Sequence, residues 1–144
     1  MLLNQLGIDL VRSFEGCSLV AYQDQGGRWT IGYGKTSGVK SGDTCTADEA
    51  NKWLMSDLQE ICKQVNSLLI NDQLNSNQYS AIVCFTYNVG AGNLKQSTLL
   101  HCINTYHVDD AANEFEKWDH INGVENAGLL RRRKAERDLF CTKC

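Results

Sequence analysis

The chain of 144 residues contains no proline, no continuous apolar stretch of 18 residues and no basic leader at its N-terminus. Without proline, and without a Ser/Gly-rich segment between two halves, nothing marks a flexible linker, so we expect one compact unit. The lack of a long apolar run excludes a membrane-spanning helix. The opening residues, MLLNQLGIDLVRSF, do not have the pattern of a secretory signal. We therefore expect a protein that stays in a cytosol unless another protein releases it.

Acidic residues slightly outnumber basic ones, which gives a net charge of −3 and a pI near 5.5. This balance does not predict nucleic acid as a partner. The stretch 128–144 differs from the rest, because it holds six basic residues and two acidic ones. A basic end on an acidic body could steer a polyanion. The alternative is a helix whose outer face is simply solvated.

No set of side chains predicts a metal or a cofactor. His101, His107 and His120 do not stand at ligand spacing from cysteine or aspartate. The cysteines number seven, and an odd count without an export signal favours free thiols. Cys141 and Cys144 form a single C-x-x-C pair that lacks a second pair, so it is a weak zinc signal. We expect neither metal nor cofactor.

Apolar periodicity predicts a helix at the N-terminus and a β-hairpin after it. The helix covers residues 3–15, and its apolar face consists of Leu3, Leu6, Leu10 and Phe14. Two alternating runs, SLVAYQD and RWTIGYGK, flank Gly26-Gly27, which is the signature of a hairpin. Thr30 on the second strand then lies on the face opposite Trp29 and Ile31.

The rest of the chain has helical periodicity. Thr46 followed by Glu49 predicts a capping box that opens a helix of more than twenty residues. Caps and breakers predict the remaining segments: a helix capped by Ser76 or Asn77 and ended by Gly90, a loop over 90–96, a short helix capped by Ser97, a helix opened by Asp109 or Asp110 that reaches Trp118, a loop over 122–128, and a last helix through Phe140.

This order of elements predicts an α+β fold with segregated layers. We expect a single domain over residues 1–144, with a small β-hairpin lobe at about 16–45. The larger, all-helical lobe covers about 46–144 and includes the N-terminal helix 3–15. The long helix that follows Thr46 joins the two lobes.

Glu15 and Asp24 are the first candidates for chemistry. Glu15 ends a helix, where the macrodipole disfavours a carboxylate, and an apolar Phe14 precedes it. Both features suit a general acid, which must keep its proton. Asp24 lies in the hairpin turn, where solvent favours an ionised carboxylate, and Thr30 offers a hydroxyl for orienting water. Two carboxyl groups in different environments divide acid and base roles in glycosidases. The alternative is an ordinary helix end and an ordinary turn.

The segment FEGCSLVAYQDQGGRWTIGYGKT resembles the phage lysozyme family, which includes T4-type and lambdoid endolysins. That family's motif is Glu, eight residues, Asp, five residues, Thr, and Glu15, Asp24 and Thr30 match this spacing. Further similarity extends over 6–140, including Asn88-Val89-Gly90 and Ser97-Thr98-Leu99-Leu100. The resemblance implies a lysozyme-like fold.

The resemblance also implies a function. Glu15 would protonate the glycosidic oxygen, and Asp24, with Thr30, would position or activate the attacking water. The substrate would be the β-1,4 bond between N-acetylmuramic acid and N-acetylglucosamine in peptidoglycan glycan strands. The family further implies a monomeric, cofactor-free, bacteriolytic enzyme. It would be made in the host bacterial cytoplasm, released through a holin, and would act in the periplasm and cell wall.

Other site residues follow from the same resemblance. Tyr33, Gly34, Asn88 and Ser97 are expected to bind substrate, although Asn88 and Ser97 could instead serve a helix terminus and a helix cap. Either Arg132 or Arg133 would orient Glu15, and a surface ion pair with Glu136 is the alternative. One departure is Ala127, which stands where lambdoid members often have proline.

Two rival functions stay open at this point. One is a lysozyme fold that binds peptidoglycan without cutting it. The intact trio of Glu15, Asp24 and Thr30 argues against such a binding module. The other is a different glycan specificity, such as chitin.

Overall fold

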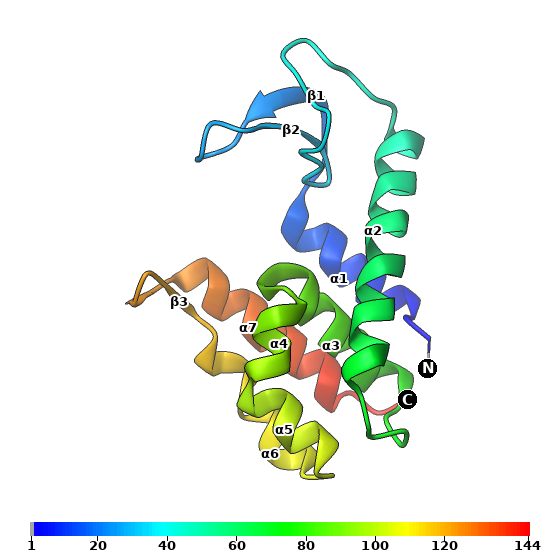
Figure 1. Ribbon diagram of the computed structural model, residues 1–144, viewed down its shortest axis with the longest axis vertical. Coiled ribbons are helices and arrows are strands. Elements are labelled where there is room, and N and C mark those ends of the chain that lie inside the picture. Colours follow the sequence, from blue (N-terminus) through cyan, green and yellow to red (C-terminus); the bar gives the residue numbers. More distant parts are fainter. Residues whose placement is uncertain (1) are drawn as a thin grey trace. The chain divides into compact units, whose positions relative to one another are not determined.

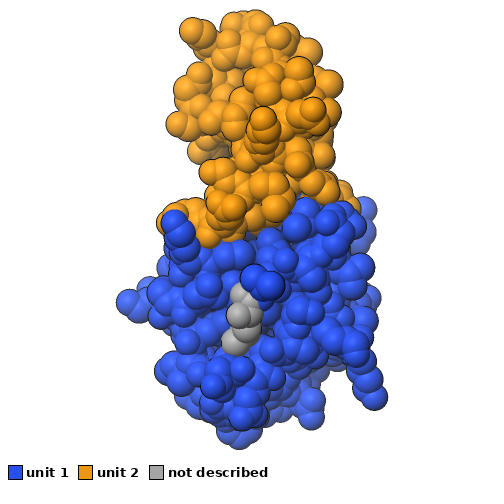
Figure 2. Space-filling model, turned by 90° about the vertical axis from the view of Figure 1, so that its right-hand side faces the viewer, with its two compact units in different colours: residues 1–11, 61–144 blue, residues 12–60 orange. Residues whose placement is uncertain are grey.

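The computed structural model describes residues 2–144 and divides into two compact units. One unit is Arg12–Glu60, and the other combines Ile61–Cys144 with residues 2–11. Figure 2 shows the two units in different colours. Helix α1 (Gln5–Glu15) and helix α2 (Ala47–Leu68) each begin in one unit and end in the other. The fold is α+β, as the sequence predicts.

The unit Arg12–Glu60 is built on the predicted hairpin. Strands β1 (Ser18–Gln23) and β2 (Trp29–Gly32) are antiparallel, with Tyr22 opposite Thr30 and an irregularity between Ser18 and Tyr22. The segment 43–45, predicted as loop, lies along β1 as well, because Cys45 N–H donates to the Leu19 carbonyl at 2.9 Å. Ala21 N–H donates to the Asp43 carbonyl at the same distance.

Helix α2 begins with the predicted capping box. Thr46 N–H donates to Glu49 Oε1 at 3.0 Å, and Glu49 N–H donates to Thr46 Oγ1 at 3.1 Å. Gly32 lies against this helix with a φ of +64°, and a Cβ there would lie 3.3 Å from both Ala50 Cβ and Trp53 Cε3. The lack of a side chain at Gly32 therefore lets β2 pack directly on the first turns of α2.

The other unit is mainly helical (Figure 1). Its elements after α2 are α3 (Ser76–Val89), α4 (Ala91–Gln96), α5 (Thr98–Asn104), α6 (Val108–Ala112), the 3₁₀ helix η1 (Phe115–Lys117), strands β3 (His120–Ile121) and β4 (Val124–Glu125), and α7 (Ala127–Cys141). Helices α3 and α7 make the most extensive pairing. Phe85 of α3 makes edge-type ring contacts with both Phe115 and Trp118, at 5.6 Å between centroids.

The apolar face predicted for α1 is wrong in part. The buried residues are Gly7, Ile8 and Val11, whereas Leu6 is 55% exposed. Close packing at Gly7 decides which face of α1 is buried, because a Cβ there would lie 2.6 Å from Ser80 Cβ of α3. Asn4 adds hydrogen bonds to the same helix, including one from its side-chain amide to Asn77 Oδ1 at 2.7 Å.

Replacing Gly7 by alanine is therefore expected to lower the free energy of unfolding, by about 1–3 kcal/mol. Alanine normally stabilises a helix relative to glycine by about 1 kcal/mol, so contact with Ser80 has to reverse the sign. Gly92→Ala is the matched control, because nothing lies within 4 Å of a Cβ built at Gly92 in α4. Urea unfolding of both variants measures the difference. A Gly7→Ala protein as stable as wild type would show that α1 and α3 can make room for the added methyl group without loss of stability.

Several predicted boundaries in the helical unit also change. Asn75, and neither Ser76 nor Asn77, caps α3, in a capping box with Gln78. Segment 90–96 is mostly helical, since α4 forms around the fully buried Leu94. The helix predicted to reach Trp118 stops at Ala112. The segment 122–128, predicted as loop, belongs partly to a hairpin of β3 and β4, in which Asn122 and Gly123 adopt φ values of +51° and +80°, and partly to α7, which begins at Ala127.

Candidate active site

Asp24 is held by the turn of the hairpin. Its Oδ1 accepts the Arg28 backbone N–H at 2.9 Å, and its Oδ2 lies 3.3 Å from Arg28 Nε. The backbone closes the same turn, because Asp24 N–H donates to the Arg28 carbonyl at 2.9 Å and Gly27 N–H donates to the Asp24 carbonyl. Gly27 has a φ of +82°, which favours glycine. Arg28 was not among the predicted site residues, although its position four residues after Asp24 across two glycines is the signal for it.

These contacts favour the ionised form of Asp24. The backbone N–H of Arg28 is the largest cause that lowers the pKa of this carboxyl below its ordinary value of 3.8, and the Arg28 guanidinium adds to it. The side chain of Asp24 is 26% exposed and that of Arg28 is 74% exposed, so solvent screens the ion pair. Asp24 is therefore a carboxylate throughout the neutral range, as the proposed base or electrostatic partner has to be.

A carboxyl whose pKa is lowered by folding stabilises the native state fully above pH 3.8 and loses this effect as pH falls through the folded value. We expect a carbon-13 NMR titration of the Asp24 carboxyl to have its midpoint below 3.8. Because the Arg28 backbone N–H is the largest cause and stays in the variant, the midpoint in Arg28→Ala should still lie below the ordinary value. A midpoint back at the ordinary value in Arg28→Ala would instead assign the effect to the guanidinium.

Thr30 stands on β2 and is almost completely buried, at 4% exposure. Its hydroxyl donates to the Arg28 carbonyl at 3.1 Å, and its backbone is opposite Tyr22. The same turn thus fixes both Asp24 and Thr30. The backbone N–H of Arg28 donates to Asp24, and the backbone carbonyl of Arg28 accepts from Thr30. The Thr30 oxygen keeps its lone pairs as hydrogen-bond acceptors, which is the property needed to hold a water proton.

Glu15 is the last residue of α1 and is half-buried. The helix ends there because Gly16 follows with a φ of +65°. A tight turn after β2, closed by two hydrogen bonds of 2.9 Å between Ile31 and Lys35, carries Gly34 next to Glu15. A Cβ at Gly34 would lie 3.7 Å from Glu15 Oε2, and the φ of +97° there favours glycine. The structure thus brings Gly34 together with Glu15, with Tyr33 half-buried in the same turn.

Arg132 and Arg133 of α7 are both buried, and neither makes the surface ion pair that was the alternative. Arg132 Nε lies 3.2 Å from Glu136 Oε2, and its guanidinium also donates to the Cys84 carbonyl at 3.1 Å. Arg133 pairs with the other oxygen of Glu136 and donates to Asn88 Oδ1. Two guanidinium groups therefore share one fully buried carboxylate.

The other predicted residues serve the helical unit. The Asn88 amide oxygen accepts a hydrogen bond from Arg133, and Ser97 caps α5 by accepting the Leu100 N–H at 3.0 Å. Ser97 also lines a hollow of about 300 Å³. The remaining lining residues are Gln96, Thr98, Leu99, Glu114, Lys117 and Trp118. Lys117 Nζ lies 2.5 Å from Glu114 Oε2, so this hollow contains an ion pair.

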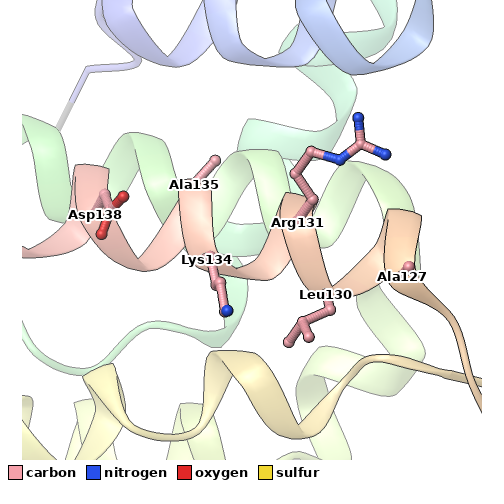
Figure 3. A pocket seen from close by; sticks show the side chains of 6 residues that line it. All are labelled: Ala127, Leu130, Arg131, Lys134, Ala135 and Asp138. Atoms are coloured by element: carbon pink, nitrogen blue, oxygen red, sulfur yellow. The ribbon is translucent and has the colours of Figure 1, made fainter.

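The basic side chains of the stretch 128–144 are divided between the interior and the surface of the helical unit. Arg132 and Arg133 are buried, and Arg137 pairs with Glu116 at 3.0 Å. Arg131 and Lys134 are exposed and line a hollow of about 450 Å³ on α7 with Asp138. Figure 3 shows these side chains, none of which belongs to the predicted site.

Over residues 2–144, no three histidine, cysteine or acidic side chains gather closely enough to hold a metal ion. Over the same residues, no helix combines the length and the apolar character needed to cross a membrane.

The model of the family described as phage lysozyme matches residues 12–136. The endolysin of Bacillus phage B103 is 43% identical over 99% of this chain, which spans only 55% of that protein. The endolysin of Acyrthosiphon pisum secondary endosymbiont phage 1 is 37% identical, over 97% of this chain and 98% of its own length.

A solved structure is similar over its whole length. The muramidase domain of SpmX from Asticaccaulis excentricus superposes with a TM-score of 0.90 at 37% identity, covering 99% of both chains.

Proposed function

This chain belongs to the phage lysozyme family, and with it to the muramidase type of glycosidase, and on that premise we propose that it cuts peptidoglycan between N-acetylmuramic acid and N-acetylglucosamine. The observation that carries this proposal is the single folded unit that holds Glu15, Asp24 and Thr30 at the family's spacing. The hydrogen bonds around Arg28 favour a charged Asp24, as the chemistry requires.

In the proposed reaction Glu15 donates a proton to the glycosidic oxygen as the bond to the sugar carbon breaks. The sugar ring then develops oxocarbenium character, which the negative charge of Asp24 stabilises. A water held by Asp24 and Thr30 attacks the same carbon from the opposite face and gives its proton to Asp24. Attack from the face opposite the leaving group inverts the anomeric configuration. It requires room for the water, which an inverting enzyme provides with carboxyl groups about 6.5–9.5 Å apart.

The remaining residues of the proposal position these groups. Tyr33 and Gly34 would contact the glycan, since the bare backbone of Gly34 admits a sugar beside Glu15. Asn88 and Ser97 are proposed contacts from the helical unit. An arginine of α7 is proposed to orient Glu15. Either Arg132 or Arg133 could take this role, and both already pair with Glu136.

The biological role proposed is lysis of a bacterial host. The enzyme would be a monomer made in the host cytoplasm, and a holin would give it access to the wall. Its relatives are named endolysins, which fits this role.

The test uses purified sacculi from a Gram-negative bacterium, freed of outer membrane. The sugar at each new reducing end is reduced with borohydride and identified after hydrolysis. A muramidase leaves N-acetylmuramic acid at the new end, so muramitol is expected. Glucosaminitol would identify a different bond, and chitin oligomers cut faster than sacculi would favour the chitin alternative. Binding to sacculi without any new reducing end would favour the non-catalytic binding module.

A further inference from the structure

Two cysteines of the unit Arg12–Glu60 lie near each other beside the proposed site. Cys17 precedes β1, and Cys45 ends the segment that runs antiparallel along the same strand. Val20 is opposite Thr44, which sets Cys45 across from Leu19, whose carbonyl accepts the Cys45 N–H. Cys17 immediately precedes Ser18, the first residue of β1. The paired segment therefore ends at Cys45 close to the end of β1 that Cys17 adjoins.

The position of the Cys45 sulfur agrees with this register. Cys45 Sγ lies 3.9 Å from the carbonyl oxygen of Ser18, the residue that follows Cys17. Burial raises the pKa of the Cys45 thiol, and the neighbouring Cys17 thiol is the next largest cause. Cys17 is exposed and Cys45 is half-buried, so one member of the pair can meet a reagent from solvent.

We propose that Cys17 and Cys45 are a modification site, at which an intramolecular disulfide closes residues 17–45 into a ring under oxidising conditions. The ring contains Asp24 and Thr30 and begins two residues after Glu15. It therefore ties the end of α1 to the segment that leads into α2. That the protein meets an oxidant at the cell wall rests on the proposed function, whereas formation of the bond does not.

The oxidant is a low-molecular-weight disulfide, such as oxidised glutathione. The Cys17 thiolate attacks one of its sulfur atoms, the glutathione disulfide breaks, and one glutathione thiolate leaves. The Cys45 thiolate then attacks the Cys17 sulfur and expels the second glutathione. Two cysteine thiols lose two protons and two electrons, and the electrons reduce one glutathione disulfide to two thiols. Exposure makes Cys17 the first to react, because a buried thiol of raised pKa supplies less thiolate.

The test incubates the folded full-length chain with oxidised glutathione, blocks free thiols with iodoacetamide and maps the unreduced digest by mass spectrometry. We expect one cross-linked species that joins the Cys17 and Cys45 peptides and disappears on reduction. Cys17→Ser and Cys45→Ala should each lack it, and Cys102→Ser, the matched control, should retain it. We also expect oxidation to raise the thermal unfolding midpoint of the wild type and of Cys102→Ser but not of Cys45→Ala.

Carbamidomethylated Cys17 and Cys45, or links only among other cysteines such as Cys141 and Cys144, would overturn the proposal. No readout here depends on glycan cleavage. A protein that forms the bond but cuts no sacculi would refute the proposed function alone.

Discussion

Replacement of Glu15 by glutamine is expected to lower the rate of sacculus hydrolysis by about 10²–10⁴-fold, the usual contribution of a general acid. Glutamine has nearly the same shape but cannot protonate the glycosidic oxygen, so binding to sacculi should persist. The rate is measured as release of soluble muropeptides, beside a co-sedimentation assay for binding. Equal thermal unfolding midpoints for variant and wild type would show that the loss is chemical rather than structural.

The matched control for this variant is Glu60→Gln. Glu60 is an exposed glutamate of the same unit, at the α2 position where that unit ends. It should hydrolyse sacculi at the wild-type rate. A Glu15→Gln protein that is as active as this control would remove Glu15 from the mechanism, and with it the assignment of Asp24 and Thr30 as its partners.

The largest effect on stability is expected at Glu136. Replacing it by alanine should lower the free energy of unfolding by about 3–5 kcal/mol, because two buried guanidinium groups lose their shared carboxylate. Both Arg132 and Arg133 are at most 5% exposed, so water cannot replace the lost partner. Urea denaturation monitored by far-UV circular dichroism measures the loss.

Comparison with Glu116→Ala separates the effect of burial at Glu136 from the effect of losing any ion pair. Glu116 pairs with Arg137 at 3.0 Å, but their side chains are 34% and 39% exposed. We expect this variant to lose only about 0–1 kcal/mol, as is usual for surface pairs. Equal losses for the two variants would contradict the view that the buried position of Glu136 decides the effect. Restored stability in a variant that replaces Glu136, Arg132 and Arg133 together by apolar residues would support it.

Features that depend on neighbouring residues could be predicted from the sequence. The capping box of Thr46 and Glu49 and the hairpin around Gly27 form through contacts within a few residues. The turn that holds Asp24 is similarly local, although the prediction missed Arg28. The small hairpin at Asn122-Gly123 had a usable signal, because this dipeptide favours the positive φ values of a tight turn.

Features that depend on distant segments could not be predicted in this way. The buried face of α1 is decided by Ser80, which is more than seventy residues away in sequence. The double pairing of Glu136 depends on the packing of α7 against α3, where Asn88 and Cys84 supply further oxygen acceptors. The sequence predicted a last helix through Phe140, but it did not specify that two consecutive arginines both point inward. For the same reason, the roles of Arg132 and Arg133 stay a proposal.

The way α1 anchors to α3 has a consequence for the order in which the protein is synthesised. Residues 2–11 pack with Ile61–Cys144, so one part of this unit is synthesised before the unit Arg12–Glu60 and the other part after it. The unit Arg12–Glu60 is continuous in sequence and can complete its contacts while translation proceeds. Asn4 and Gly7 must wait for Ser76, Asn77 and Ser80, and α3 must wait for α7. The helical unit can therefore complete its packing only after α7 has been synthesised.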